Sequence, residues 1–272
     1  MLTNATKSKK VMISSAAVIT VVVLTYLLKS SSSLPNVINT PQATLKALPD
    51  FASIVDVKTK KQQFFETLYP IIAEENAHIM MLRETVIGLR SKPELSKSEK
   101  QWVSELASSY KVKLTVEQKG FYQALLKKLD YVPASLALTQ AAIESGWGSS
   151  RFSKQGNNLF GHWCFRKGCG MVPSSRDEGK GHEVAKFKTV NASVRAYIKN
   201  LNTNHAYASL RETRASLRKA EKPVTGVVLA KSLNRYSEEG DHYVAKVTKF
   251  IRQNKLNRYN TLFEEQYLQR DS

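Results

Sequence analysis

Residues 136–151 read LALTQAAIESGWGSSR, a nearly apolar run that ends on Glu144 and then breaks into glycines. Pro133 is suited to begin a helix there and Gly146 to end it, so we expect Glu144 in the last turn of a buried helix. Burial and the negative end of the helix dipole both favour the protonated form of a carboxyl group. The segment therefore predicts a general acid, and the alternative is an N-capping or ion-paired glutamate at a domain edge.

The pattern on either side of this helix predicts a mainly helical α+β protein. Apolar residues recur at helical spacing along most of the chain after residue 56, whereas residues 161–190 alternate turn signals with short strand-like pieces. A helical body with a small β-hairpin lobe beside an acid-bearing helix is a lysozyme-like arrangement. We expect Pro70 to kink or divide the first helix and Asn191 to cap the helix that follows the lobe.

Two motifs give the chain a family resemblance. Glu144-Ser-Gly-Trp-Gly-Ser149 is followed by Gly156-Asn-Asn-Leu-Phe-Gly161, and at this spacing the pair resembles the bacterial glucosaminidases of glycoside hydrolase family 73. The resemblance covers residues 112–255 and, in a membrane-associated member of the family, extends upstream to residue 56. It implies a catalytic role for Glu144 and cleavage of the β-1,4 glycan of peptidoglycan beside N-acetylglucosamine (GlcNAc). We expect no cofactor.

Cleavage of a glycosidic bond also needs support for the positive charge on the other face of the sugar. The resemblance directs the search to the β lobe, which offers Asp177, Glu178 and Glu183. Glu178 is the preferred partner because it lies in a turn at residues 176–179, whereas Glu183 is expected on a strand face. A substrate-assisted course, in which the sugar's own N-acetyl group attacks the anomeric carbon, would need no second nucleophile.

Aromatic and amide side chains are the candidates for substrate binding. Tyr236 and Tyr243 lie where the family carries tyrosines, and Tyr236 resembles the tyrosine of the family's cleft, while Tyr243 equally suits core packing. Trp147 is expected either to stack on sugar or to cap the core beneath its glycine turn. Phe160 is expected to pack and hold the turn in which Asn158 would meet an N-acetyl group, and both are counted as candidate substrate contacts.

Cys164 and Cys169 are the only cysteines, and both fall in the predicted lobe. In an exported chain such a pair is expected to form a disulfide that closes a small loop. The alternative is a metal site with His162 and His182, because two cysteines and two histidines can supply four zinc ligands. We favour the disulfide and expect no metal.

The N-terminus carries a predicted membrane anchor. Residues 11–28 form an 18-residue run without a charge, preceded by Lys7, Lys9 and Lys10 and followed by Lys29. Such a run is just long enough to cross a bilayer, and the preceding lysines favour a cytoplasmic N-terminus. We therefore expect a single span in the inner membrane with the body of the protein in the periplasm. A cleaved signal peptide is the competing interpretation, but its apolar region is usually shorter.

The chain is expected to divide into segments with different roles. They are residues 1–10 as a cytoplasmic N-terminus, 11–28 as the anchor, 29–55 as a Ser-, Thr- and Pro-rich tether, 56–111 as a helical N-terminal extension, 112–255 as the glucosaminidase-like catalytic domain and 256–272 as a C-terminal tail. The formal charge of +18 is spread along the chain and favours a long anionic partner, such as nucleic acid, anionic lipid or a cell-wall polymer. An extracytoplasmic body argues against nucleic acid.

The sequence thus predicts a membrane-anchored, glucosaminidase-like peptidoglycan hydrolase. A muramidase or a lytic transglycosylase that uses the same glutamate is the alternative among enzymes. A glycan-binding scaffold without turnover is the alternative of another class, since the second carboxylate is not fixed by the pattern. Nucleic-acid binding ranks below both.

Overall fold

The computed structural model describes residues 33–41, 43–173, 181–233, 236 and 240–268. The chain divides into two units, Met1–Pro35 and Asn36–Ser272, and every helix and strand given below belongs to the second unit. Within the described residues, no helix is both long and apolar enough to cross a membrane. The anchor predicted over residues 11–28 lies outside the described residues.

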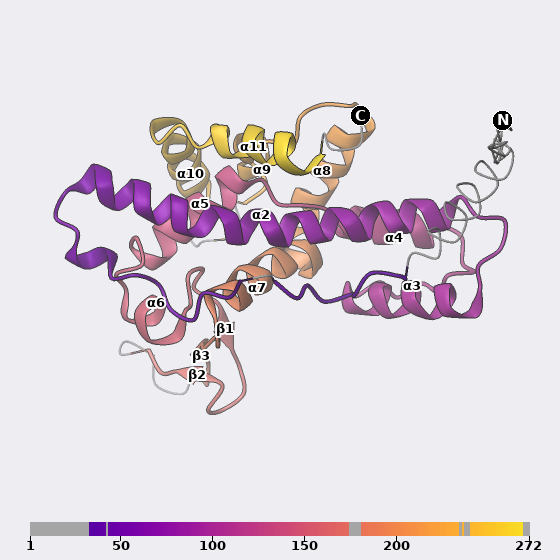
Figure 1. Ribbon diagram of the computed structural model, residues 1–272, viewed down its shortest axis with the longest axis horizontal. Helices are drawn as coiled ribbons and strands as arrows, with labels where there is room; N and C mark the ends of the chain where they lie inside the picture. The colour runs from indigo at the N-terminus through magenta and orange to yellow at the C-terminus, as the bar shows by residue number, and fades with distance from the viewer. Residues whose placement is uncertain (1–32, 42, 174–180, 234–235, 237–239, 269–272) are drawn as a thin grey trace, which may run out of the picture. The chain divides into compact units, whose positions relative to one another are not determined.

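Helices dominate the second unit, with a small sheet among them (Figure 1). The helices are α2 (Val57–Arg90), α3 (Lys97–Ser109), α4 (Phe121–Lys128), α5 (Ala134–Ser145), α6 (Arg151–Gly156), α7 (Val190–Thr203), α8 (Ala208–Lys219), α9 (Gly226–Ala230), α10 (Asp241–Gln253) and α11 (Asn257–Phe263). Short helical turns are η1 (Phe51–Ser53), η2 (His205–Tyr207) and η3 (Glu264–Leu268), and the strands are β1 (Trp163–Cys164), β2 (Gly170–Met171) and β3 (Glu183–Ala185). The mainly helical α+β prediction is confirmed.

Helix α5, the predicted acid-bearing helix, packs among four others. It contacts α2, α9, α10 and α11. All of its residues except Ile143 and Glu144 are buried. Pro133 precedes the helix and Gly146 ends it with a φ of 57°, a left-handed conformation that glycine adopts without a steric penalty. Both predicted ends of this helix are therefore confirmed.

Buried polar side chains fix the segment that leads into α5. Asn76 of α2 donates to the carbonyl of Val132 at 2.8 Å and accepts from its N–H at 3.1 Å. Arg214 of α8, which is fully buried, donates to the carbonyls of Asp130 and Tyr131 at 3.2 and 2.9 Å. Since these main-chain groups are out of reach of water, the side chains that satisfy them hold the start of α5 in place.

Three arginines surround Asp130 in the segment that leads into α5. Arg218 donates to Oδ1 of Asp130 at 2.7 Å, and Arg214 and Arg83 lie 3.7 and 3.9 Å from Oδ2. Burial alone would raise the pKa of Asp130, but Arg214 and the hydrogen bond from Arg218 hold it below its ordinary value. The carboxylate therefore stays charged and completes the frame around the start of α5.

The predicted N-terminal extension and C-terminal tail both pack against α5. Helix α2 runs unbroken from Val57 to Arg90 with Pro70 inside it, so the proline does not divide the helix. From α11, Asn260 accepts from the N–H of Ser135 at 2.9 Å and donates to its hydroxyl at 3.0 Å. The expected tail thus supplies a cap for the first turn of α5.

The β lobe is a three-stranded antiparallel sheet in the order β1-β3-β2. Val184 of β3 pairs with Trp163 on one side and with Met171 on the other. Cys164 and Cys169 form the predicted disulfide between β1 and the loop that leads to β2. The strands are only two or three residues long, so this small sheet depends on local ties.

Residues 36–41 and 43–53, which fall in the predicted tether, form a strap docked on the helical body. Asn191 of α7 accepts from the N–H of Leu45 at 2.9 Å and donates to the carbonyl of Ala43 at 3.1 Å. Thr189, two residues earlier, caps α7 by accepting from Ala192. The cap predicted at Asn191 is therefore wrong, because that side chain holds the strap.

Candidate active site

Glu144 stands at the end of a directed chain of hydrogen bonds. Tyr243 of α10 donates its hydroxyl to Oε1 of Glu144 at 2.7 Å. Gln140, one turn earlier on α5, donates from Nε2 to the Tyr243 hydroxyl at 3.0 Å, and Tyr197 of α7 donates to Oε1 of Gln140 at 2.6 Å. The side chains of Tyr243, Gln140 and Tyr197 are buried, while Glu144 is partly exposed. The chain directs the hydroxyl proton of Tyr243 at the carboxylate.

Tyr197 and Tyr243, the two tyrosines in this chain of hydrogen bonds, are fixed donors. Burial raises the pKa of Tyr243 far above its ordinary value, and the adjacent Glu144 raises it further. Burial likewise raises the pKa of Tyr197. Neither hydroxyl therefore loses its proton near neutral pH, and both keep their direction.

Tyr236 lies beside the chain with its ring partly exposed. It stacks on Tyr243 with centroids 5.4 Å apart and 14° between the planes, and its hydroxyl donates to the carbonyl of Phe160 at 3.2 Å. The ring of Tyr207 of η2 also lies near it, with centroids 5.9 Å apart. Tyr236 thus lies beside the residues that orient Glu144, and its role as a sugar platform stays a prediction, whereas the buried Tyr243 orients the carboxylate.

The turn at residues 157–161 brings the second motif against the first. Asn158 donates to the carbonyls of His162 and Ala185 at 2.8 and 2.9 Å, and its oxygen accepts from the N–H of His162 at 2.9 Å. Because these bonds use both donors and the oxygen of the amide, Asn158 fixes the turn and does not have the free amide expected for an N-acetyl group. At Gly161, a β-carbon would lie 3.9 Å from Oε2 of Glu144, so the two motifs meet there.

Two of the predicted aromatic contacts are packed against other rings. Phe160 is 3% exposed and stacks on Tyr197 at 4.0 Å between centroids. Trp147 lies 5.4 Å from Phe65 of α2 and 5.4 Å from Phe250 of α10, again between centroids. These contacts favour packing for Phe160 and the core-capping alternative for Trp147.

The acidic residues of the β lobe have different placements. Glu183 is 6% exposed and accepts from the N–H groups of Gly168 and Gly170 at 2.9 and 2.8 Å, so it ties the β1–β2 loop to β3. Glu183 thus lies in a strand, as expected, but its side chain is buried and bonded to the loop. Asp177 and Glu178 lie outside the described residues, and the catalytic role of Glu178 stays a prediction.

The alternative metal site at Cys164, Cys169, His162 and His182 would lack its two thiolate ligands. Since the sulfurs of Cys164 and Cys169 are bonded to each other, neither is available as a thiolate ligand. His182 stacks on Trp163 at 4.2 Å between centroids. Burial lowers the pKa of His162 to about 4, so this imidazole is neutral near pH 7.

Gln140 and Tyr197 belong to the chain of hydrogen bonds that ends at Glu144, and the sequence analysis did not identify them. Gln140 had a visible signal, because it is a polar residue in an apolar run and lies four residues before Glu144, on the same face of the helix. Tyr197 had none, since its position on the apolar face of a predicted helix also suits simple packing.

The arrangement holds one carboxyl group in a fixed orientation, with one face toward solvent and an aromatic ring nearby. A carboxyl group so placed can transfer a proton to or from a bound molecule.

Comparisons with known proteins find similar sequences. The glucosaminidase family model, described as mannosyl-glycoprotein endo-beta-N-acetylglucosaminidase, matches residues 119–256. Protein bax of Escherichia coli (strain K12) is 36% identical over 202 residues, which are 74% of this chain and 72% of that protein. Exo-glucosaminidase LytG of Bacillus subtilis (strain 168) is 29% identical over 149 residues, 52% of this chain and 50% of that protein.

A crystal structure is also similar. The catalytic domain of the autolysin Auto from Listeria monocytogenes aligns with a TM-score of 0.43 and 19% identity, over 76% of this chain and 92% of that one.

Proposed function

The chain belongs to the glucosaminidase family and is a glycoside hydrolase, and from that premise we propose that it hydrolyses peptidoglycan as an endo-β-N-acetylglucosaminidase. In this proposal Glu144 is the general acid, and the β-1,4 glycan is cut so that GlcNAc carries the new reducing end. The family model and the relatives' names support the substrate class.

The orientation of Glu144 is the observation that carries the proposal. A general acid must be held within hydrogen-bond reach of the leaving oxygen, in a defined orientation. The 2.7 Å bond from the Tyr243 hydroxyl fixes one carboxylate oxygen of Glu144, and Gln140 fixes that hydroxyl in turn. Oε2, toward which Gly161 faces, is then the oxygen that would meet substrate.

In the proposed reaction, Glu144 gives its proton to the glycosidic oxygen as the bond from that oxygen to the anomeric carbon breaks. The charge on the anomeric carbon is met on its other face by a carboxylate or by the sugar's own N-acetyl oxygen. Water then adds to the anomeric carbon and gives up a proton, which restores the acid. We keep Glu178 as the proposed second carboxylate because the sequence predicts a turn at residues 176–179.

Digestion of purified peptidoglycan by the full chain tests the proposal. Wild type is compared with Glu144→Gln and with Glu84→Gln, a matched change at an exposed position of α2. We expect fragments with GlcNAc at the reducing end from wild type and Glu84→Gln, and a loss of about 10²–10⁴-fold in rate for Glu144→Gln. Mass spectrometry of the new ends gives the readout.

Other products would lead to other assignments. N-acetylmuramic acid at the new reducing ends would show a muramidase, and anhydro ends a lytic transglycosylase. Release of single GlcNAc residues from strand ends would show exo action. Intact glycan with all three proteins, at concentrations where binding is evident, would contradict the proposed hydrolysis of this substrate.

We also propose that residues 11–28 anchor the protein in the inner membrane with its catalytic unit in the periplasm. The run without charges and its preceding lysines support this topology, and the Cys164–Cys169 disulfide suits an oxidising compartment. Protease added to intact spheroplasts should digest the catalytic unit. Protection until the cells are lysed would contradict the topology.

A further inference from the structure

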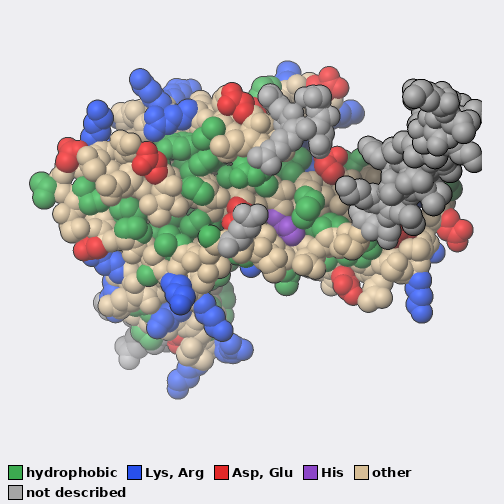
Figure 2. Space-filling model, in the orientation of Figure 1, with side chains coloured by type: hydrophobic (Ala, Val, Ile, Leu, Met, Phe, Trp, Pro, Cys, Tyr) green, Lys and Arg blue, Asp and Glu red, His purple; other side chains and the backbone are tan. Residues whose placement is uncertain are grey.

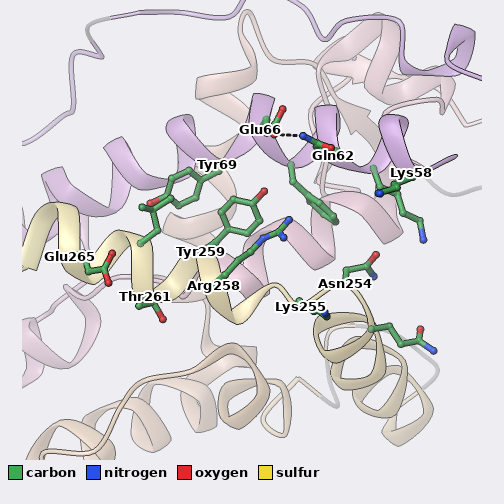
Figure 3. Close-up of a pocket in the computed structure, with 14 residues that line it drawn as sticks. Lys58, Gln62, Glu66, Tyr69, Asn254, Lys255, Arg258, Tyr259, Thr261 and Glu265 are labelled. Carbon is green, nitrogen blue, oxygen red and sulfur yellow. Dashed lines mark hydrogen bonds between the residues drawn. The ribbon is translucent and has the colours of Figure 1, made fainter. Parts of the chain in front are cut away.

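A groove of about 1030 Å³ runs between α2 and the segment from the end of α10 to η3 (Figure 3). It shares no lining residue with the hydrogen-bond chain of Glu144. Figure 2 shows hydrophobic side chains on the face that carries α2 and α11, with basic and acidic side chains at its margins. The α2 side of the groove lies wholly outside residues 119–256, which the family model matches.

Four cations line the groove: Lys58, Lys61, Lys255 and Arg258. Lys58, Lys255 and Arg258 are exposed, and Lys61 is partly exposed. Within the described part of the chain, none of the four is paired with a carboxylate. The groove therefore offers positive charge to an external anion.

The groove has an apolar floor and two acidic margins. Phe65, Tyr69 and Tyr259 form the floor, and the last two rings lie 4.9 Å apart between centroids. Glu66 and Glu265 are both exposed at its edge, and Glu66 accepts from Gln62 of the same helix. A ligand that matches this lining carries carboxylates, a positive group and short apolar side chains.

We propose that this groove binds a peptide stem of peptidoglycan, which rests on the proposed function. Peptidoglycan stems alternate alanine with dicarboxylic and diamino residues, so one stem supplies free carboxylates for the lysines, a free amine for a glutamate and methyl groups for the floor. The volume is sufficient, because pockets of about 300–1,000 Å³ bury a drug-sized ligand.

The two acidic residues favour the stem over a polyphosphate chain. A uniform polyanion would bring negative charge against Glu66 and Glu265 at the same time as it paired with the cations. Like charges brought together in this way weaken binding and select against such a partner. A zwitterionic peptide avoids that repulsion.

Two residues of the groove contact the loop that follows α5. Phe65 lines the groove and contacts the Trp147 ring, and the Nζ of Lys61 lies 5.4 Å from the centroid of that ring. Trp147 comes three residues after Glu144. A stem held in the groove would therefore retain the wall polymer next to the element that carries the proposed acid.

Calorimetric titration of the full chain with the soluble tetrapeptide L-alanyl-γ-D-glutamyl-meso-diaminopimelyl-D-alanine tests the proposal. The groove variant carries Lys58→Gln, Lys61→Gln, Lys255→Gln and Arg258→Gln. The control variant removes the same charge at exposed positions away from the groove, with Lys97→Gln, Lys100→Gln, Lys113→Gln and Lys119→Gln. We expect the groove variant to bind about tenfold more weakly or worse, and the control to bind like wild type.

A double variant, Lys58→Gln with Lys255→Gln, guards against damage to the fold and should weaken binding by about threefold. Equal binding of the tetrapeptide to wild type and groove variant, or no binding to wild type, would overturn the proposal. Tighter binding of inorganic polyphosphate than of the tetrapeptide, lost in the groove variant, would also overturn it, in favour of a polyanion site.

Glycan strands stripped of their stems separate this proposal from the proposed function. Wild type and groove variant should cut stripped strands at the same rate, while Glu144→Gln should not cut them. Tetrapeptide binding without cleavage of any glycan would refute the hydrolase and leave the groove standing. Cleavage of stripped strands without tetrapeptide binding would support the hydrolase and refute the proposed role of the groove.

Discussion

Helix α5 carries Glu144 and the chain enters the β lobe beside it at Gly161, but the helix and the lobe hold their polar groups in different ways. Around α5, side chains of α2, α7, α8, α10 and α11 donate hydrogen bonds, so the helix that carries the carboxylate is held by elements far apart in the sequence. In the β lobe, the disulfide spans five residues and Glu183 bonds to N–H groups 13 and 15 residues away. Trp163 and Phe165 of the lobe are also 57% and 79% exposed.

A glycosidase needs a proton donor and support for the positive charge on the other face of the sugar, and the difference between the two regions bears on the first. A proton donor must keep one orientation, which a network buried among helices provides. A small lobe with local ties and exposed rings has fewer constraints on its position. Substitutions of the side chains that hold α5 should therefore lower stability or activity more than substitutions in the lobe.

Removal of Arg214 is the strongest way to break the frame. Its guanidinium, fully buried, satisfies carbonyls of residues 127, 130 and 131 and faces Asp130. Arg214→Met should lower the free energy of unfolding by about 3–5 kcal/mol, because it leaves buried acceptors without donors. Chemical unfolding measures the effect. Arg90→Met, at an exposed position, should cost less than about 1 kcal/mol. Equal costs would show that the frame does not depend on Arg214.

His162 makes the lobe sensitive to pH. Burial lowers its pKa to about 4, whereas an unfolded histidine titrates near about 6.5. Between these values the unfolded chain binds the proton and the folded protein does not, so stability is full above about pH 6.5 and falls toward pH 4, by up to about 3 kcal/mol.

Unfolding curves at pH 7 and pH 4.5 should therefore differ more for wild type than for His162→Phe. The phenylalanine keeps the ring contacts that His162 makes with Phe160 and Phe187. The same pH dependence in both proteins would show that other groups cause it.

Tyr243→Phe tests the link between frame and acid with little change in packing. Loss of the hydroxyl that donates to Glu144 should lower kcat about tenfold, roughly 1.4 kcal/mol, with KM nearly unchanged. Gln140→Leu should give a smaller loss, about threefold, because it acts only through Tyr243. Tyr131→Phe, whose hydroxyl bonds to Val224, is the control and should keep wild-type kcat. A fall in KM alone for Tyr243→Phe would contradict the orienting role.

The sequence predicts the helix of Glu144 because its start, apolar run and end all lie within one short segment. It does not predict the strap at residues 36–41 and 43–53, since Leu45 and Asn191 meet across a wide gap in the sequence. Asn158 shows the same limit, because an amide side chain in a turn suits either a ligand or its own main chain. Only the partners His162 and Ala185 decide between them.

The central claim is that Glu144 acts as the proton donor, and a change of leaving group tests it most directly. Rates of wild type and Glu144→Gln are measured on peptidoglycan glycan and on a dinitrophenyl glycoside of a GlcNAc oligomer, whose leaving group needs no proton. The account predicts a loss of about 10²–10⁴-fold on the glycan and less than about tenfold on the dinitrophenyl glycoside. Equal losses on both substrates would contradict it, because they would show that Glu144 contributes something other than the proton.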